Sequence, residues 1–154
     1  MKIVNLASAQ SSWRGYEYYE DGKVISYKQI ADGVYQGQVK GSDNAVYNVT
    51  IDLNKVRNSS CDCPFAKSGT RIICKHIVAL YFTVFPNDAE EYKKQADEEQ
   101  AAYEAWEEKL PELVEAYVCK LSKKELQEQL LDVLFTSDDW VLDRYIRDHD
   151  ISDE

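Results

Sequence analysis

A chain of 154 residues, of which 44% are hydrophobic and 12% aromatic, can form one ordinary domain or a small domain with an extension, so its composition excludes wholesale disorder. No segment approaches the roughly 20 apolar residues of a membrane span, and the apolar stretch Ile3–Ala7 is too short for a secretion signal. We therefore expect a cytoplasmic protein that has no membrane partner.

The net charge of −10 is divided unevenly along the chain. Residues 1–86 contain ten Lys/Arg and seven Asp/Glu, which gives +3, whereas residues 87–154 contain eight and twenty-one, which gives −13. This change follows Pro86 and predicts two domains, 1–86 and 87–154. Phosphate backbones repel the acidic half, so only the first half could approach a nucleic acid unaided.

The aromatic segment 13–24 is predicted to be a turn that leads into a strand, with Gly15 and the Asp21-Gly22 pair marking the turns. Its aromatic side chains are expected to form a sheet face that packs on the core. The alternative is a platform on which nucleic-acid bases stack. The residues concerned are Trp13, Tyr16, Tyr18 and Tyr19.

Three strands of an antiparallel sheet are expected next, at Val24–Ile30, Val34–Val39 and Tyr47–Leu53. The Asp32-Gly33 pair between the first two is a strong hairpin signal. The third strand alternates apolar and polar residues, which predicts one buried face. The sheet therefore needs an element that covers this face.

Three of the four cysteines and one of the two histidines fall within sixteen residues. Cys61 and Cys63 form a C-x-C pair, and after ten intervening residues Cys74 and His76 form a C-x-H pair. Thiolate and imidazole ligands in two close pairs across a short loop are what a tetrahedral Zn²⁺ site requires. The pattern predicts one structural Zn²⁺ ion as the cofactor, and it suits a reducing compartment in which thiols stay free.

The spacing of the second pair limits where the next helix can begin. Residues two apart on a helix point about 200° away from each other, so both reach one ion only if Cys74 precedes the helix and His76 lies in its first turn. We expect a helix that begins near Lys75 and is ended by Pro86. Its buried side chains would be Ile77, Val78, Leu80, Tyr81 and Val84.

The two Cys/His pairs, the proline after the second cysteine and the sequence CKHI at the start of an apolar helix resemble the SWIM-type zinc finger. The upstream strands extend the resemblance, which is to bacterial SWIM domains, over roughly residues 5–85. The resemblance implies that Cys61, Cys63, Cys74 and His76 are the four zinc ligands. It also implies that the domain binds DNA or other proteins, together with chromatin-remodelling-type ATPases, plant transposases and recombination factors. No ATPase, transposase or kinase motif accompanies it here, so we expect an accessory factor or a stand-alone module.

The Cys/His cluster has competing interpretations. Four protein ligands leave no position open for water, which favours a closed, non-catalytic site for zinc, or for another metal such as iron. A cysteine nucleophile with His76 as its base would make a thiol enzyme, but it needs an orienting group and an oxyanion site that no local motif supplies. A C-x-C redox pair leaves Cys74 and His76 unexplained. We therefore expect no catalytic residue.

Three basic residues lie near the predicted ligands in the sequence: Lys67, Arg71 and Lys75. A Zn²⁺ ion with three thiolates and a neutral histidine carries a net charge of −1, which these residues could offset. They are also candidates for binding a phosphate or an acidic partner. The alternative is that they are solvated loop charges.

The acidic half is predicted to be all-α, with three to four helices. Asn87 with Glu90, and Ser122 with Glu125, are capping-box pairs that open helices. Apolar residues three and four apart, in a series that Glu99 interrupts, predict a narrow stripe on the first helix, which Pro111 could kink or divide. We expect this stripe to pack against the zinc domain or the next helix, and the alternative is that it binds a partner. The stripe consists of Tyr92, Ala96, Tyr103, Trp106, Leu110, Leu113 and Tyr117.

We therefore predict an α+β fold, in which a small antiparallel β-sheet with a zinc knuckle and a covering helix precedes an acidic all-α extension. In this extension we expect Cys119 to be buried and His149 to be exposed. The leading functional interpretation is a non-enzymatic zinc-binding interaction module that binds a protein, a nucleic acid or both, and no small-molecule substrate. The alternatives are a DNA- or RNA-binding accessory factor that uses the basic surface of residues 1–86, and a Cys-dependent thiol enzyme. The charge of residues 87–154 favours a protein partner.

Overall fold

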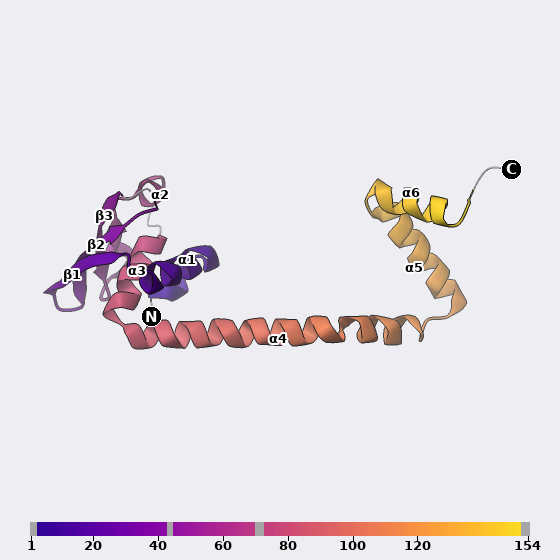
Figure 1. Ribbon diagram of the computed structural model, residues 1–154, viewed down its shortest axis with the longest axis horizontal. Coiled ribbons are helices and arrows are strands. Elements are labelled where there is room, and N and C mark those ends of the chain that lie inside the picture. The colour runs from indigo at the N-terminus through magenta and orange to yellow at the C-terminus, as the bar shows by residue number, and fades with distance from the viewer. Residues whose placement is uncertain (1–2, 43–44, 70–72, 152–154) are drawn as a thin grey trace. The chain divides into compact units, whose positions relative to one another are not determined.

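A computed structural model describes residues 3–42, 45–69 and 73–151. In these residues a four-stranded antiparallel sheet is combined with helices, which confirms the predicted α+β class (Figure 1). The strands are β1 (Val24–Ala31), β2 (Val34–Lys40), β3 (Val46–Asp52) and β4 (Ser60–Cys61). The α-helices are α1 (Ala9–Glu20), α2 (Pro64–Lys67), α3 (Lys75–Val84), α4 (Pro86–Val118), α5 (Lys123–Thr136) and α6 (Asp139–Asp148), and the 3-10 helices are η1 (Ile3–Leu6) and η2 (Val56–Asn58).

The chain divides into two compact units, Met1–Asp97 and Glu98–Glu154, and the division falls within α4. The first unit contains the sheet, α1 to α3 and the first turns of α4. The second contains the rest of α4 together with α5 and α6. The domain boundary between residues 86 and 87 stays a prediction. Within the described ranges, no helix combines the length and the apolar character that crossing a membrane requires.

Helix α1 occupies the segment that was expected to be a turn and a strand, so that prediction is wrong. The Ser8 hydroxyl caps the helix by accepting the backbone N–H of Ser11 at 3.2 Å. The rings of Tyr16 and Tyr19, three residues apart on one helix face, contact Phe82 of α3 at centroid distances of 6.0 and 6.2 Å. These aromatic residues therefore pack on the core from a helix.

The three predicted strands are confirmed as β1, β2 and β3, and the sheet order is β1-β2-β3-β4. The Asp32-Gly33 turn joins β1 to β2, and Gly33 adopts the left-handed φ of 66° that such a turn requires. β2 and β3 pair in continuous register from Val34↔Asp52 to Lys40↔Val46. The short strand β4 was not predicted.

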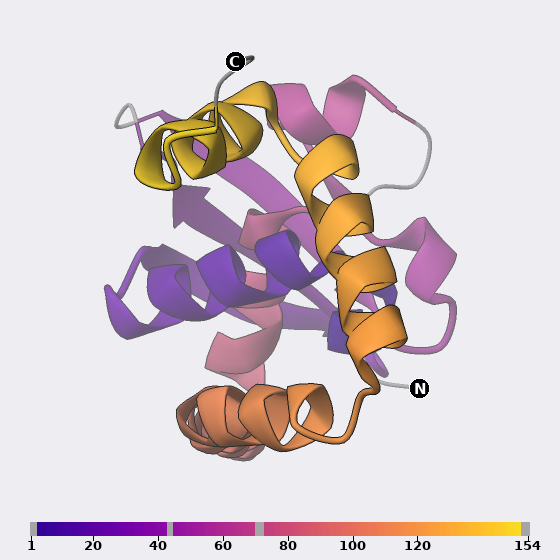
Figure 2. The ribbon, with the colours of Figure 1, turned by 90° about the vertical axis from the view of Figure 1, so that its right-hand side faces the viewer.

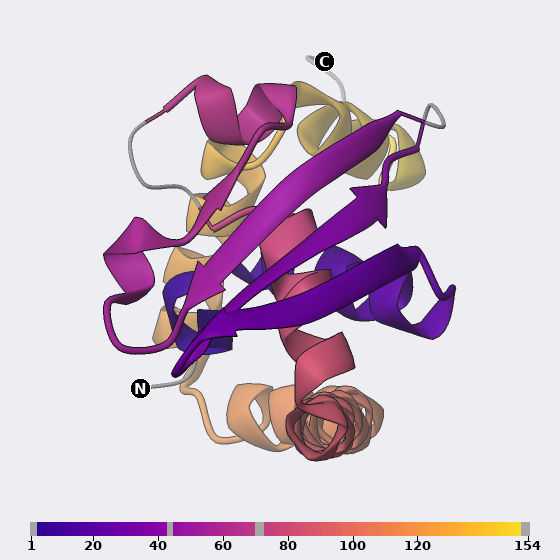
Figure 3. The same ribbon diagram turned by 90° about the vertical axis from the view of Figure 1, so that its left-hand side faces the viewer.

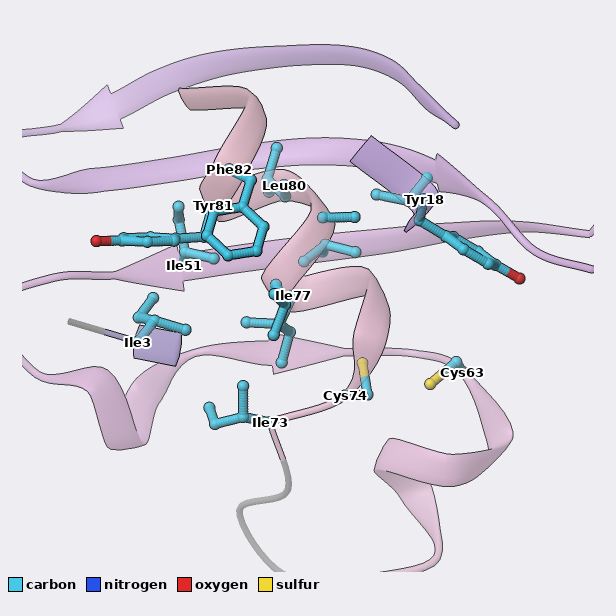
Figure 4. Close-up of a cluster of buried hydrophobic side chains, with 14 of the residues drawn as sticks. Ile3, Tyr18, Ile51, Cys63, Ile73, Cys74, Ile77, Leu80, Tyr81 and Phe82 are labelled. Atoms are coloured by element: carbon cyan, nitrogen blue, oxygen red, sulfur yellow. The ribbon is translucent and has the colours of Figure 1, made fainter. Parts of the chain in front are cut away.

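Helix α3 covers one face of the sheet, as predicted, and α1 packs against α3 (Figure 3). Seven consecutive residues, His76–Phe82, are buried, because α3 has neighbours on more than one side. Figure 4 shows Ile77 and Leu80 of α3 in one cluster with Ile51 of β3. Each fully buried Ile, Leu or Phe side chain stabilises the fold by roughly 1.5–3 kcal/mol.

Two glycines let α3 approach its neighbours closely. A Cβ atom at Gly15 of α1 would lie 2.5 Å from Cγ1 of Val78 and 3.0 Å from the carbonyl oxygen of Lys75. A Cβ atom at Gly37 of β2 would lie 2.8 Å from Cδ1 of Leu80. Real Cβ atoms essentially never come under 3.0 Å, so a side chain at either position would displace α3 or its neighbour.

Helix α4 begins at Pro86, where the missing N–H of proline costs no helical hydrogen bond. The Phe85 carbonyl accepts the N–H of Asp88 at 3.0 Å. Asn87 therefore lies inside the helix, and the prediction that it is an N-cap is wrong. Pro111 also lies inside α4, which continues past it to Val118.

In the second unit, α5 opens with the predicted capping box. The Ser122 N–H donates to Oε2 of Glu125 at 2.8 Å, and the Glu125 N–H donates to Oγ of Ser122 at 3.3 Å. Helix α6 follows a short turn and packs on α5 (Figure 2). Cys119 is exposed in the turn after α4, so its predicted burial is wrong, whereas His149 is exposed as expected.

Replacing Gly15 with alanine tests the close packing of α1 and α3. We expect Gly15→Ala to lower the free energy of unfolding by about 1–3 kcal/mol, because the added methyl group meets Val78. Helix propensity alone would raise the stability by about 1 kcal/mol. Denaturant unfolding measures the difference. Val78→Ala should offset part of the loss when the two changes are combined, and a Gly15→Ala variant more stable than the parent would contradict this packing.

Candidate metal centre

The C-x-C pair lies where β4 leaves the sheet. Cys61 is the last residue of β4 and pairs with β3. Between the cysteines, the Asp62 carboxylate accepts the backbone N–H of Asn48 at 2.9 Å and its side-chain amide at 3.0 Å. Cys63 then caps α2, and its Sγ accepts the N–H of Ala66 at 3.4 Å. The loop between the two sulfur atoms is thereby fixed to β3.

The C-x-H pair lies at the start of α3, as the helix geometry predicts. Cys74 is the N-cap residue, with an extended ψ of 166°, and His76 lies in the first turn. Nδ1 of His76 is 3.8 Å from Sγ of Cys61 and 3.8 Å from Sγ of Cys74. The imidazole ring packs against the rings of Tyr18 and Tyr47, at centroid distances of 5.5 and 4.8 Å.

The two pairs bring four metal-binding atoms together. Three sulfur atoms and one imidazole nitrogen all lie within 4.8 Å of one another. Figure 4 shows the sulfur atoms of Cys63 and Cys74 beside each other at the start of α3. Tetrahedral zinc with Zn–S bonds of about 2.3 Å places its sulfur ligands about 3.8 Å apart, so the cluster needs to contract by about 1 Å at most.

Backbone N–H groups favour the thiolate form of these cysteines. The backbone N–H of Cys63 favours the thiolate of Cys61, and that of Ile77, which donates to the Cys74 carbonyl oxygen at 3.0 Å, favours the thiolate of Cys74. The Cys61 thiol also donates to the Cys74 sulfur, which lowers the pKa of Cys74 to about 4 and raises that of Cys61. Burial raises the pKa of Cys63. A cation at this point would favour loss of the remaining thiol protons.

The histidine is oriented for the same role. His76 is only 4% exposed, and its Nε2 has no hydrogen-bond partner among the residues that the structure describes. With Nδ1 among the sulfur atoms, the tautomer that carries its proton on Nε2 leaves the Nδ1 lone pair free for an ion. The residues present therefore fit a metal ion bound through Nδ1.

A comparison with protein-family models identifies this region. Residues 47–85 match the SWIM zinc finger. The match runs from β3 to the residue after α3 and includes all four donor residues. No curated protein and no solved structure matches the chain. The SWIM zinc finger and its Cys₃His cluster indicate one structural zinc ion, as the sequence predicts.

The three basic residues that were expected to bind a partner lie in different surroundings. Lys67 is exposed at the end of α2, and Arg71 lies outside the described residues. Nζ of Lys75 donates to the Tyr18 hydroxyl at 2.6 Å and to Oγ of Ser42 at 3.2 Å. Burial raises the pKa of Tyr18, but the hydrogen bonds from Lys75 and Ser42 outweigh this and lower it overall. The role of the three residues in binding stays a prediction.

A groove of about 190 Å³ adjoins the SWIM zinc finger and contains residues that the sequence did not single out. Arg14 of α1, Phe65 of α2 and Lys75 line it together with Gln10 and Ser11, and the donor residues Cys63, Cys74 and His76 form its inner wall. Phe65 is 56% exposed. Recognition of α1 as a helix, from Ser8 and the aromatic spacing, would have placed Gln10 and Arg14 on one helix face.

Substitution of a donor residue tests the metal centre. We expect the purified chain to contain about one zinc ion, and Cys63→Ser or His76→Ala to lose it and unfold at lower temperature, because metal binding contributes folding free energy. Elemental analysis and thermal unfolding measure both effects. Cys119→Ser is the matched control, since Cys119 is exposed in the other unit. Full zinc content in Cys63→Ser would contradict the ligand assignment.

Proposed function

We propose that the chain is a non-enzymatic interaction module, in which one zinc ion holds the fold and the partner is a protein. The closed donor set carries this proposal. Cys61, Cys63, Cys74 and His76 supply four donor atoms, and a tetrahedral zinc ion with four protein ligands has no position left for water or substrate. Zinc bound here joins β4 to the start of α3, so its role is to stabilise the fold.

The surroundings of the cysteines support this function over that of a thiol enzyme. A nucleophilic cysteine needs a base that can take its proton and stay free to return it. His76, the histidine beside the sulfur atoms, offers them Nδ1, which a bound zinc ion would occupy. His149 is exposed near the end of α6, in the other unit.

Charge supports a protein partner over a nucleic acid. The chain as a whole has a net charge of −10, which opposes approach to a phosphate backbone. Lys75, a candidate for phosphate contact, already donates to Tyr18 and Ser42. Binding of phosphate by Lys75 would have to compete with these two hydrogen bonds.

The groove beside the zinc finger favours one alternative, a DNA- or RNA-binding accessory factor. Arg14 and Lys75 supply positive charge in the groove, the exposed Phe65 ring offers a stacking surface, and Lys67 follows on the same short helix. Cations interleaved with an exposed aromatic ring are a common arrangement for single-stranded nucleic acid. This alternative uses the surface of the first unit only.

Thiol reactivity distinguishes the module from a thiol enzyme. In the zinc-loaded protein we expect iodoacetamide to modify Cys119 and to spare the three cysteines of the zinc finger, because metal-bound thiolates that are also buried react slowly. Peptide mass spectrometry after timed alkylation measures this, and exposed Cys119 is the internal control. Fast modification of Cys61, Cys63 or Cys74 in zinc-loaded protein would refute the closed site.

Oligonucleotide binding distinguishes the two kinds of partner. The probes are labelled single-stranded DNA and RNA. We expect that Lys67→Glu does not weaken any binding of these probes by the full zinc-loaded chain. Lys28→Glu, an equal change of charge at an exposed position on β1, is the matched control. Binding that falls at least tenfold between about 50 and 200 mM salt and is lost in Lys67→Glu, but not in Lys28→Glu, would establish the nucleic-acid alternative instead.

A further inference from the structure

The second unit leaves most of its large apolar side chains exposed. Among its described residues, 98–151, only Leu134 is buried. Soluble monomers rarely expose large contiguous apolar surfaces, and a unit of this size needs a core to be stable. The exposed set comprises Tyr103, Trp106, Leu110, Leu113, Val114, Tyr117, Val118, Leu126, Leu130, Leu131, Val133, Phe135, Trp140, Ile146 and Ile151.

Five of these residues form one stripe along α4, called here the α4 stripe: Tyr103, Trp106, Leu110, Leu113 and Tyr117. Their spacing alternates between three and four residues, which places them on one face of the helix. Their exposed fractions range from 36% to 54%. An apolar repeat of 3.5 residues on average is the pattern that receives the side chains of another helix. The spacing therefore indicates that the occupant of the stripe is a helix.

The C-terminal end of the stripe is held in place from within the unit. Nε2 of Gln129 on α5 donates to the hydroxyl of Tyr117 at 2.9 Å. At the other end, the rings of Tyr103 and Trp106 contact each other with centroids 5.9 Å apart. These contacts order the aromatic side chains before any partner arrives, which reduces the entropy that binding would cost.

The charge of the unit indicates what kind of helix it receives. Residues 98–154 contain six Lys/Arg and seventeen Asp/Glu, a net charge of −11. On α4, the exposed Glu107 lies beside the stripe, as does Lys109, whereas Glu104, Glu108, Glu112 and Glu115 are exposed on other faces of the helix. A second copy of the unit would bring the same negative charge, whereas a basic helix is attracted. Charge complementarity therefore favours a basic partner over self-association.

We propose that the α4 stripe binds a basic amphipathic helix of a partner protein. The apolar face of that helix packs on the five stripe residues, and the net negative charge of the unit attracts its Lys or Arg side chains. This inference rests on the proposed function as a protein-binding module and assigns the kind of partner and the surface that receives it. It involves neither the zinc donors nor the groove beside them.

A synthetic helical peptide tests the proposal on the full zinc-loaded chain. The probe is a labelled peptide of about 20 residues that consists of leucine and lysine, with leucine at heptad spacing. One control has the same composition in an order without an apolar face, and another has glutamate in place of lysine. We expect fluorescence anisotropy to show binding of the probe, and binding at least tenfold weaker for both controls.

Two protein variants locate the binding surface. Leu113→Ser should weaken binding of the probe about tenfold, because a central apolar contact is lost. Ile25→Ser is the matched control, because Ile25 on β1 is 56% exposed and Leu113 is 54% exposed. It should leave binding of the probe unchanged. Equal binding of the peptide without an apolar face, or equal binding by Leu113→Ser, would overturn the proposal. A concentration-dependent dimer that Leu113→Ser abolishes would overturn it in favour of a second copy. If zinc content and thiol protection are intact, these results would refute the role of the α4 stripe but not the assignment of a structural zinc module.

Discussion

The convergence of four donor atoms on one point, where β4 leaves the sheet and α3 begins, is the constraint on which the first unit depends. Between the two Cys/His pairs, Pro64, Phe65 and Lys67 of α2 are exposed and add little apolar packing to the fold. Structural zinc in small modules contributes about 10–16 kcal/mol, which equals or exceeds the total stability of about 5–15 kcal/mol typical of a domain. The apolar packing around α3 therefore completes a structure whose chain path the metal centre fixes.

This arrangement separates the role of the metal from the role of the surface. Because four protein atoms would surround a zinc ion, the recognition proposed above uses surfaces beside the metal centre or in the helical unit. The two surfaces differ in chemistry: the groove at Arg14 and Phe65 is cationic and aromatic, whereas the α4 stripe is apolar and belongs to an acidic unit. The partners that these two surfaces favour differ in charge, which is negative for the groove and positive for the α4 stripe.

The metal centre and the sheet could be predicted from the sequence because both depend on local rules. The 100° step between helical residues requires Cys74 to lie before α3, and it does. The segment of α1 was predicted wrongly, because Gly15 and the Asp21-Gly22 pair are typical turn signals and were given more weight than Ser8 and the aromatic spacing. In the folded protein Gly15 serves close packing on Val78, a tertiary contact with no local signature. The prediction that Cys119 is buried was also wrong. Its apolar neighbours in the sequence suggested a core, but they belong to helices on which little is packed.

X-ray absorption at the zinc edge of the purified full chain tests the central claim most directly, because it reports the atoms bound to the metal. Three sulfur atoms at about 2.3 Å and one nitrogen atom at about 2.0–2.1 Å are the expected shell. A shell that contains a water oxygen, or only one or two sulfur atoms, would contradict a closed structural site at Cys61, Cys63, Cys74 and His76.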